Sequence, residues 1–111
     1  MRRDESYLLD ILLAAQRATR HLEGIQQQTF KQSELLQDGV VRALEIVGEA
    51  AGHISGEFRE KYPEIAWHKM IGMRNRLIHE YFRVNYGAVW DTVKNDLPDL
   101  IEILETIVPS E

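Results

Sequence analysis

The chain has 111 residues, of which 44% are hydrophobic and 28% are charged, and its formal net charge is −5. This size and composition are typical of a small globular protein, so we expect residues 1–111 to form one domain. The sequence contains no cysteine, which excludes disulfides, thiolate zinc sites and cysteine nucleophiles.

Apolar residues never form a run of the roughly 20 that a membrane-spanning helix needs, and the first residues do not resemble a secretory signal. We therefore expect a cytoplasmic protein with no membrane contact. The charge is unevenly distributed, because residues 66–86 carry +3 while the rest of the chain carries −8. Any polyanion is thus expected to bind locally, at residues 66–86.

The first predicted element is a long amphipathic helix from Asp4 to about Gln26, where apolar residues recur at steps of three and four. Thr29 and Gln32 have capping-box spacing, which favours a short helical turn at residues 30–32.

A second long helix is expected to begin near Ser33. Gly39, Gly48 and Gly52 interrupt its apolar stripe, and this spacing of small residues suits close packing against another helix. The segment between Gly56 and Pro63 is predicted to be a break, because proline cannot continue a helix.

A third helix is expected at about residues 67–82, followed by a turn at Asn85 and Gly87 and a fourth helix. Pro98 either opens a last helix or kinks a continuous one, and we favour a break with a new start. No segment alternates with the period of two that strands show. The predicted fold is therefore all-α, an antiparallel four- to five-helix bundle.

The third helix gathers most of the side chains that could do chemistry: Arg74, Asn75, Arg76, His79, Tyr81 and Arg83. RNA can be cleaved without a metal if a base takes the proton of the 2′-hydroxyl and a cation stabilises the charge on the phosphate. Histidine exchanges protons near neutral pH, and arginine presents a fork that matches phosphate oxygens. His79 and Arg74 are the candidates for these two roles.

Helical geometry separates the two candidates by about 140° around the helix. Either the Arg74 side chain curls round, or a second copy of the chain supplies the complementary group, and we prefer a homodimer. Asn75 lies one turn before His79 and is a supporting candidate that could orient the ring or bind the same phosphate. Arg74 and Tyr81, seven residues apart, are expected to lie nearly in line.

The segment from Arg74 to Tyr81, RNRLIHEY, resembles the Arg-x4-His-x-Tyr motif of the HepT-like branch of the HEPN superfamily. Flanking blocks of the sequence agree with the same family: residues 44–51 (LEIVGEAA), Trp67, residues 70–73 (MIGM), residues 89–93 (VWDTV) and residues 96–98 (DLP). The resemblance covers most of residues 34–104 and rests on this ordered set of blocks.

This resemblance implies a helical homodimer that acts as the toxin of a toxin–antitoxin system. Toxins of this kind cut RNA, a tRNA or an mRNA, without a metal or other cofactor, and Arg74 and His79 match their catalytic positions. The usual partner is a minimal nucleotidyltransferase (MNT) antitoxin that transfers AMP from ATP to the motif tyrosine. Tyr81 matches that acceptor, and a bulky anionic group there would repel an RNA backbone.

Several alternatives remain open at this stage. The chain could be a non-catalytic HEPN subunit that presents a substrate or nucleotide to a nucleotidyltransferase, or a plain helical dimerisation module. Glu49 and His53 have the one-turn spacing of a metal pair, but no further ligand is suitably spaced. Trp67 and Trp90 are expected to be packing anchors. Arg76 and Arg83 either help to hold RNA or lie on a solvated surface.

Overall fold

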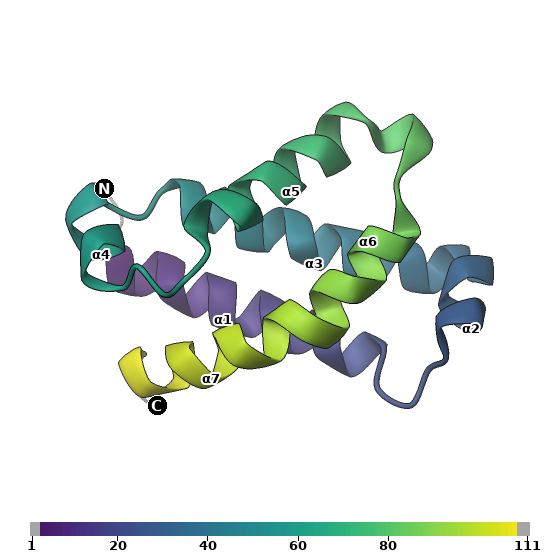
Figure 1. The fold of residues 1–111 in the computed structure, drawn as a ribbon, viewed down its shortest axis with the longest axis horizontal. Coiled ribbons are helices and arrows are strands. Elements are labelled where there is room, and N and C mark those ends of the chain that lie inside the picture. Colours follow the sequence, from purple (N-terminus) through teal and green to yellow (C-terminus); the bar gives the residue numbers. More distant parts are fainter. Residues whose placement is uncertain (1–2, 109–111) are drawn as a thin grey trace.

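The computed structural model describes residues 3–108, and all regular structure in this part of the chain is helical (Figure 1). In chain order the elements are α1 (Asp4–His21), α2 (Gln27–Gln32), α3 (Glu34–Gly52), α4 (Gly56–Lys61), α5 (Trp67–His79), the 3-10 turn η1 (Tyr81–Arg83), α6 (Tyr86–Asp91), the π-helical segment η2 (Thr92–Asp96) and α7 (Leu97–Ile107). The described residues contain no strand, which confirms the predicted all-α class.

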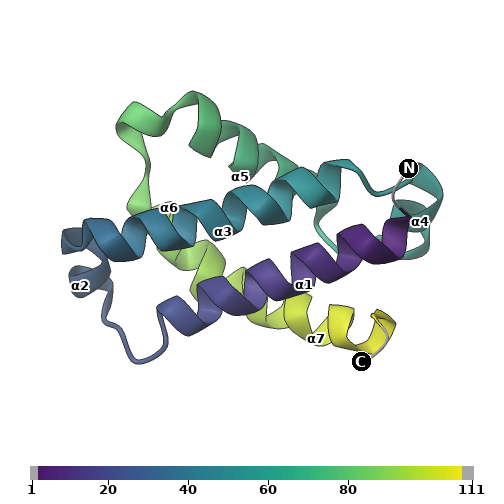
Figure 2. The same cartoon turned by 180° about the vertical axis from the view of Figure 1, so that it is seen from behind.

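The long helices α1 and α3 lie side by side and run antiparallel (Figures 1 and 2). Helix α5 packs against α3, and α7 packs against α1. The short helices α2 and α4 lie at opposite ends of the α1–α3 pair and add to the four or five helices expected (Figure 2). No helix within residues 3–108 is long and apolar enough to cross a bilayer.

The core forms where the apolar stripes of these helices meet. Its largest fully buried side chains are Leu8, Ile11, Leu22, Phe30, Val40, Val89, Val93, Leu97 and Leu104. Burial of each such side chain contributes about 1.5–3 kcal/mol, which makes this core the main source of stability. The buried Phe30 ring packs against Trp90, 5.9 Å between centroids, and thereby ties α2 to α6.

Two boundaries near the start of the chain differ from the prediction. Helix α1 ends at His21 rather than near Gln26, because the chain turns at Gly24, whose φ of 72° lies in the left-handed region that glycine adopts freely. Helix α2 begins at Gln27, so Thr29 lies inside it and does not cap it. The predicted start of α3 is confirmed, since Leu36 N donates to Ser33 Oγ at 3.2 Å.

The predicted break between Gly56 and Pro63 contains the short helix α4. Ser55 caps it by accepting a hydrogen bond from Phe58 N at 3.2 Å. Asp4, at the start of α1, accepts hydrogen bonds from both Ser55 N (2.9 Å) and Ser55 Oγ (2.6 Å). A side-chain cap and a long-range contact, neither visible as an apolar stripe, therefore make this segment helical.

The expected break before Pro98 is wrong. The backbone stays helical from α6 through η2 into α7, with φ −91° and ψ −41° at Asp96 and φ −66° and ψ −36° at Leu97. A proline inside a helix lacks an N–H donor and crowds the carbonyl four residues before it. The wider π-helical turn immediately before Pro98 accommodates both effects, so the helix continues.

Candidate active site

Helix α5 carries most of the motif, and its start is fixed by Trp67. That side chain is buried, and its Nε1 donates to the Tyr62 carbonyl oxygen at 3.1 Å, which confirms Trp67 as a packing anchor. The helix ends at His79, three residues earlier than predicted, because Glu80 leaves helical geometry at φ −115° and ψ 36°. Tyr81 therefore belongs to η1, and the expected alignment of Arg74 and Tyr81 along one helix is wrong.

The middle of α5 lies unusually close to α3 at Gly48. A Cβ atom added there would overlap Arg74 Cβ and come within 2.6 Å of the Met70 carbonyl oxygen. The prediction of close packing is confirmed at this position. It is wrong for Gly52, where an added Cβ would meet no atom within 4 Å. Gly48 thus sets how near the Arg74 backbone comes to α3.

Arg74 is held on two sides. Its Nη2 lies 3.1 Å from Glu49 Oε2, and its Nη1 donates to Asn75 Oδ1 at 3.0 Å. The side chain is 29% exposed. Its Nε is buried and, among the described residues, has no hydrogen-bond partner. Because guanidinium has five N–H donors, further donors on the two Nη nitrogens remain for a ligand.

The hydrogen bond of Asn75 is with Arg74, whose Nη1 donates to Asn75 Oδ1. The geometry keeps the amide oxygen as an acceptor for Arg74, which fixes one edge of the planar fork.

A polar groove opens beside Arg74, between α1, α3 and α5. It has a volume of about 320 Å³ and is lined by Tyr7, Asp10, Arg42, Glu45, Ile46, Glu49, Ala50, His53, Arg74 and Ile78. His79 is not among these lining residues. Within one chain this groove therefore contains Arg74 but not His79.

The other end of α5 is open. His79 is exposed, and the apolar side chains around it are also exposed: Ile78 by 37%, Tyr81 by 76% and Phe82 by 69%. The Tyr81 and Phe82 rings meet edge to face with centroids 5.8 Å apart. We call Ile78, Tyr81 and Phe82 the apolar rim. Arg83 lies beside this rim, 3.3 Å from Glu80 and 5.6 Å from the Phe82 ring centroid.

Glu49 and His53 have the spacing of a metal pair. Their side chains do meet, with His53 Nε2 at 3.2 Å from Glu49 Oε1, and within residues 3–108 no third histidine, aspartate or glutamate joins them. Helical spacing alone does not predict the contact of Glu49 with Arg74, because it cannot place a residue of α3 beside one of α5. The signal for it was Gly48, the close-packing position next to Glu49.

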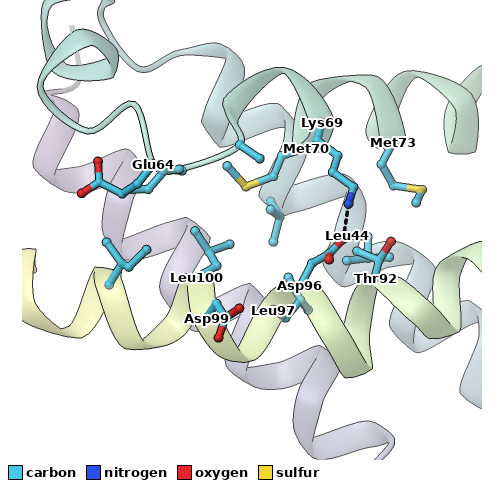
Figure 3. A pocket seen from close by; sticks show the side chains of 14 residues that line it. Leu44, Glu64, Lys69, Met70, Met73, Thr92, Asp96, Leu97, Asp99 and Leu100 are labelled. Atoms are coloured by element: carbon cyan, nitrogen blue, oxygen red, sulfur yellow. Dashed lines mark ion pairs between the residues drawn. The ribbon is translucent and has the colours of Figure 1, made fainter.

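A second pocket, of about 190 Å³, lies between α5 and the η2–α7 segment (Figure 3). Apolar side chains such as Met70, Met73 and Leu100 line it, and Lys69 Nζ bonds Asp96 Oδ2 across it at 2.7 Å. None of the predicted site residues lines this pocket.

An all-helical bundle with Arg-x4-His on one partly exposed helix is the arrangement of a HEPN-type protein. A family model described as "Ribonuclease HepT-like" matches residues 11–107. The chain belongs to this HepT-like ribonuclease family.

Relatives agree with this assignment over nearly the full length. "Probable ribonuclease HepT" of Thermococcus cleftensis is 40% identical over 89% of this chain and 90% of its own length. "Putative RNase MJ1380" of Methanocaldococcus jannaschii is 38% identical over 93% and 94%, respectively. "Putative RNase TTE0752" of Caldanaerobacter subterraneus is 37% identical over 100% and 99%. No solved structure matches the chain.

Proposed function

We propose that this protein is the toxin of a HEPN/MNT toxin–antitoxin pair, a metal-independent endoribonuclease whose active site combines Arg74 and His79 at a homodimer interface. Membership of the HepT-like family supports ribonuclease activity. The names of the relatives as ribonucleases point in the same direction.

One observation carries the dimeric site: Arg74 is anchored at the edge of a groove, while His79 stands exposed among the apolar rim. Exposed apolar side chains that gather at one place mark an interaction surface. If the rims of two copies meet across a two-fold axis, the His79 of one chain approaches the Arg74 of the other.

The chemistry needs only these two side chains and the RNA. His79 accepts the proton of a ribose 2′-hydroxyl, the 2′-oxygen forms a bond to phosphorus, and the bond from phosphorus to the 5′-oxygen breaks. The proton is returned to the departing 5′-oxygen, leaving a 2′,3′-cyclic phosphate and a 5′-hydroxyl. Arg74 donates hydrogen bonds to the phosphate oxygens and stabilises the charge that accumulates there.

The toxin is neutralised by transfer of AMP to Tyr81. This residue is 76% exposed and therefore accessible to a modifying enzyme. An MNT antitoxin would supply ATP, the Tyr81 oxygen would attack its α-phosphorus, and pyrophosphate would leave. The AMP group adds negative charge two residues from His79. That charge would repel the RNA backbone and disrupt packing of the apolar rim.

The direct test is cleavage of single-stranded RNA by the purified protein in the presence of EDTA, with products analysed for 2′,3′-cyclic phosphate. Arg74→Ala and His79→Ala are each expected to lower the rate by about 10²- to 10⁴-fold while circular dichroism shows a folded protein. Normal cleavage by either variant would remove that residue from the mechanism. No cleavage by the unaltered protein would favour the non-catalytic subunit instead.

A further inference from the structure

The polar groove beside Arg74 contains a flat aromatic pair that the proposed chemistry does not use. The rings of Tyr7 and His53 stack with centroids 4.9 Å apart and planes inclined by only 12°. Tyr7 is half-buried and packs against the core, so it forms a firm support. The His53 side chain is 53% exposed.

The His53 ring is also held at its edge, where Nε2 lies 3.2 Å from Glu49 Oε1. Tyr7 covers one face of the ring and Glu49 one edge, so the exposed part comprises the opposite face and the remaining edges. Because His53 lines the groove, this aromatic surface is available to a molecule that enters it.

Glu49 connects this ring to the motif, because its other oxygen lies 3.1 Å from Arg74 Nη2. A single carboxylate thus separates the His53 ring from the Arg74 guanidinium. Arg74 and His53 also line the same groove, so a chain whose phosphate lies on Arg74 would bring a neighbouring base to His53.

The charges of the groove favour a base over a second phosphate at this position. Glu45 and Glu49 line it, and the Arg42 guanidinium is drawn to Glu45 at 3.4 Å. Carboxylates repel phosphate but accept hydrogen bonds from the amino groups of bases. An uncharged base stacked on an aromatic ring fits these surroundings, and unpaired RNA bases commonly bind in this way.

We propose that the groove is a nucleobase subsite, in which His53, supported by Tyr7 and oriented by Glu49, stacks on an unpaired base of the RNA next to the phosphate bound by Arg74. This inference rests on the proposed ribonuclease function. It implies that the RNA substrate is single-stranded at the point of cleavage.

The test compares two substitutions of similar size that both remove the hydrogen bond to Glu49. His53→Phe keeps a flat ring on Tyr7, whereas His53→Leu does not. Both are made in a full-length His79→Ala background, which leaves the RNA uncut, and His68→Leu on exposed α5 surface is the matched control. The probe is a single-stranded RNA oligonucleotide that contains 2-aminopurine, whose fluorescence falls when the base stacks.

We expect His53→Leu to weaken RNA binding by about 5- to 100-fold and to abolish the quenching, the loss typical of one stacked base. His53→Phe and His68→Leu should bind and quench like the parent. Equal binding and quenching by His53→Leu and His68→Leu would overturn the subsite. If these variants behave as expected but the unaltered protein does not cut RNA, the base site stands and the nuclease proposal fails.

Discussion

The two ends of the motif helix, α5, differ in how they pack against the rest of the chain. At Arg74, α5 is pressed against α3, and the guanidinium is anchored by Glu49 and Asn75. At His79, five residues later, the helix ends and the side chains around it stand in solvent. One half of the proposed site is thus built by a single chain, and the other half has the features of a surface that a second chain completes.

The anchored half depends on Gly48, so Gly48→Ala should have the largest effect on folding. The added methyl group overlaps Arg74 Cβ and approaches the Met70 carbonyl, which forces α3 and α5 apart. We expect the free energy of unfolding in urea to fall by about 1–3 kcal/mol. Gly52→Ala on the same helix is the control, because its methyl group meets no atom within 4 Å and alanine favours a helix. Equal stability of the two variants would mean that the helices are not in close contact at Gly48.

Substitutions in the open half, at the apolar rim, should weaken dimerisation and leave the stability of the fold nearly unchanged. Phe82→Ser removes a 69% exposed ring from the apolar rim, and we expect about tenfold weaker dimerisation with little change in unfolding. Sedimentation velocity over a dilution series measures the dissociation constant of the dimer. Leu35→Ser serves as control, because Leu35 is 84% exposed but lies at the start of α3, outside the motif. Association that survives Phe82→Ser but not Leu35→Ser would place the interface elsewhere.

The smallest effect on cleavage is expected for Tyr81→Phe, which deletes one exposed hydroxyl. Stability should stay within about 0.5 kcal/mol of the parent, and RNA should still be cut. Adenylylation should disappear, as seen by intact mass spectrometry after incubation with the antitoxin and ATP. An AMP adduct that persists in Tyr81→Phe would put the acceptor at another residue.

Local signals in the sequence predicted much of the fold. The apolar stripes gave the long helices, and Ser33 and Asn85 gave two helix starts. The three glycines of α3 predicted close packing, which is confirmed at Gly48 and wrong at Gly52. Errors occurred where a distant contact or a backbone adjustment decides the structure. Asp4 reaches across to Ser55 at the start of α4, and a π-helical turn carries the last helix past Pro98.

The candidate site likewise contains residues that the sequence could identify and residues that it could not. Arg74 and His79 could be selected from the motif, and their separation around the helix could be predicted from its geometry. The partnership of Arg74 with Glu49, and through it with His53, depends on the register between α3 and α5. No periodicity within either helix contains that register, and Gly48 marks a close-packing position on α3 without identifying which residue of α5 lies opposite it.

The most direct test of the two-chain site is to mix Arg74→Ala protein with His79→Ala protein, each inactive alone, and to measure RNA cleavage after the subunits exchange. If each site takes its arginine from one chain and its histidine from the other, half of the randomly formed dimers have one intact site, and about a quarter of the unaltered activity returns. A mixture that forms mixed dimers, as native mass spectrometry would show, yet stays as inactive as its components would contradict the account.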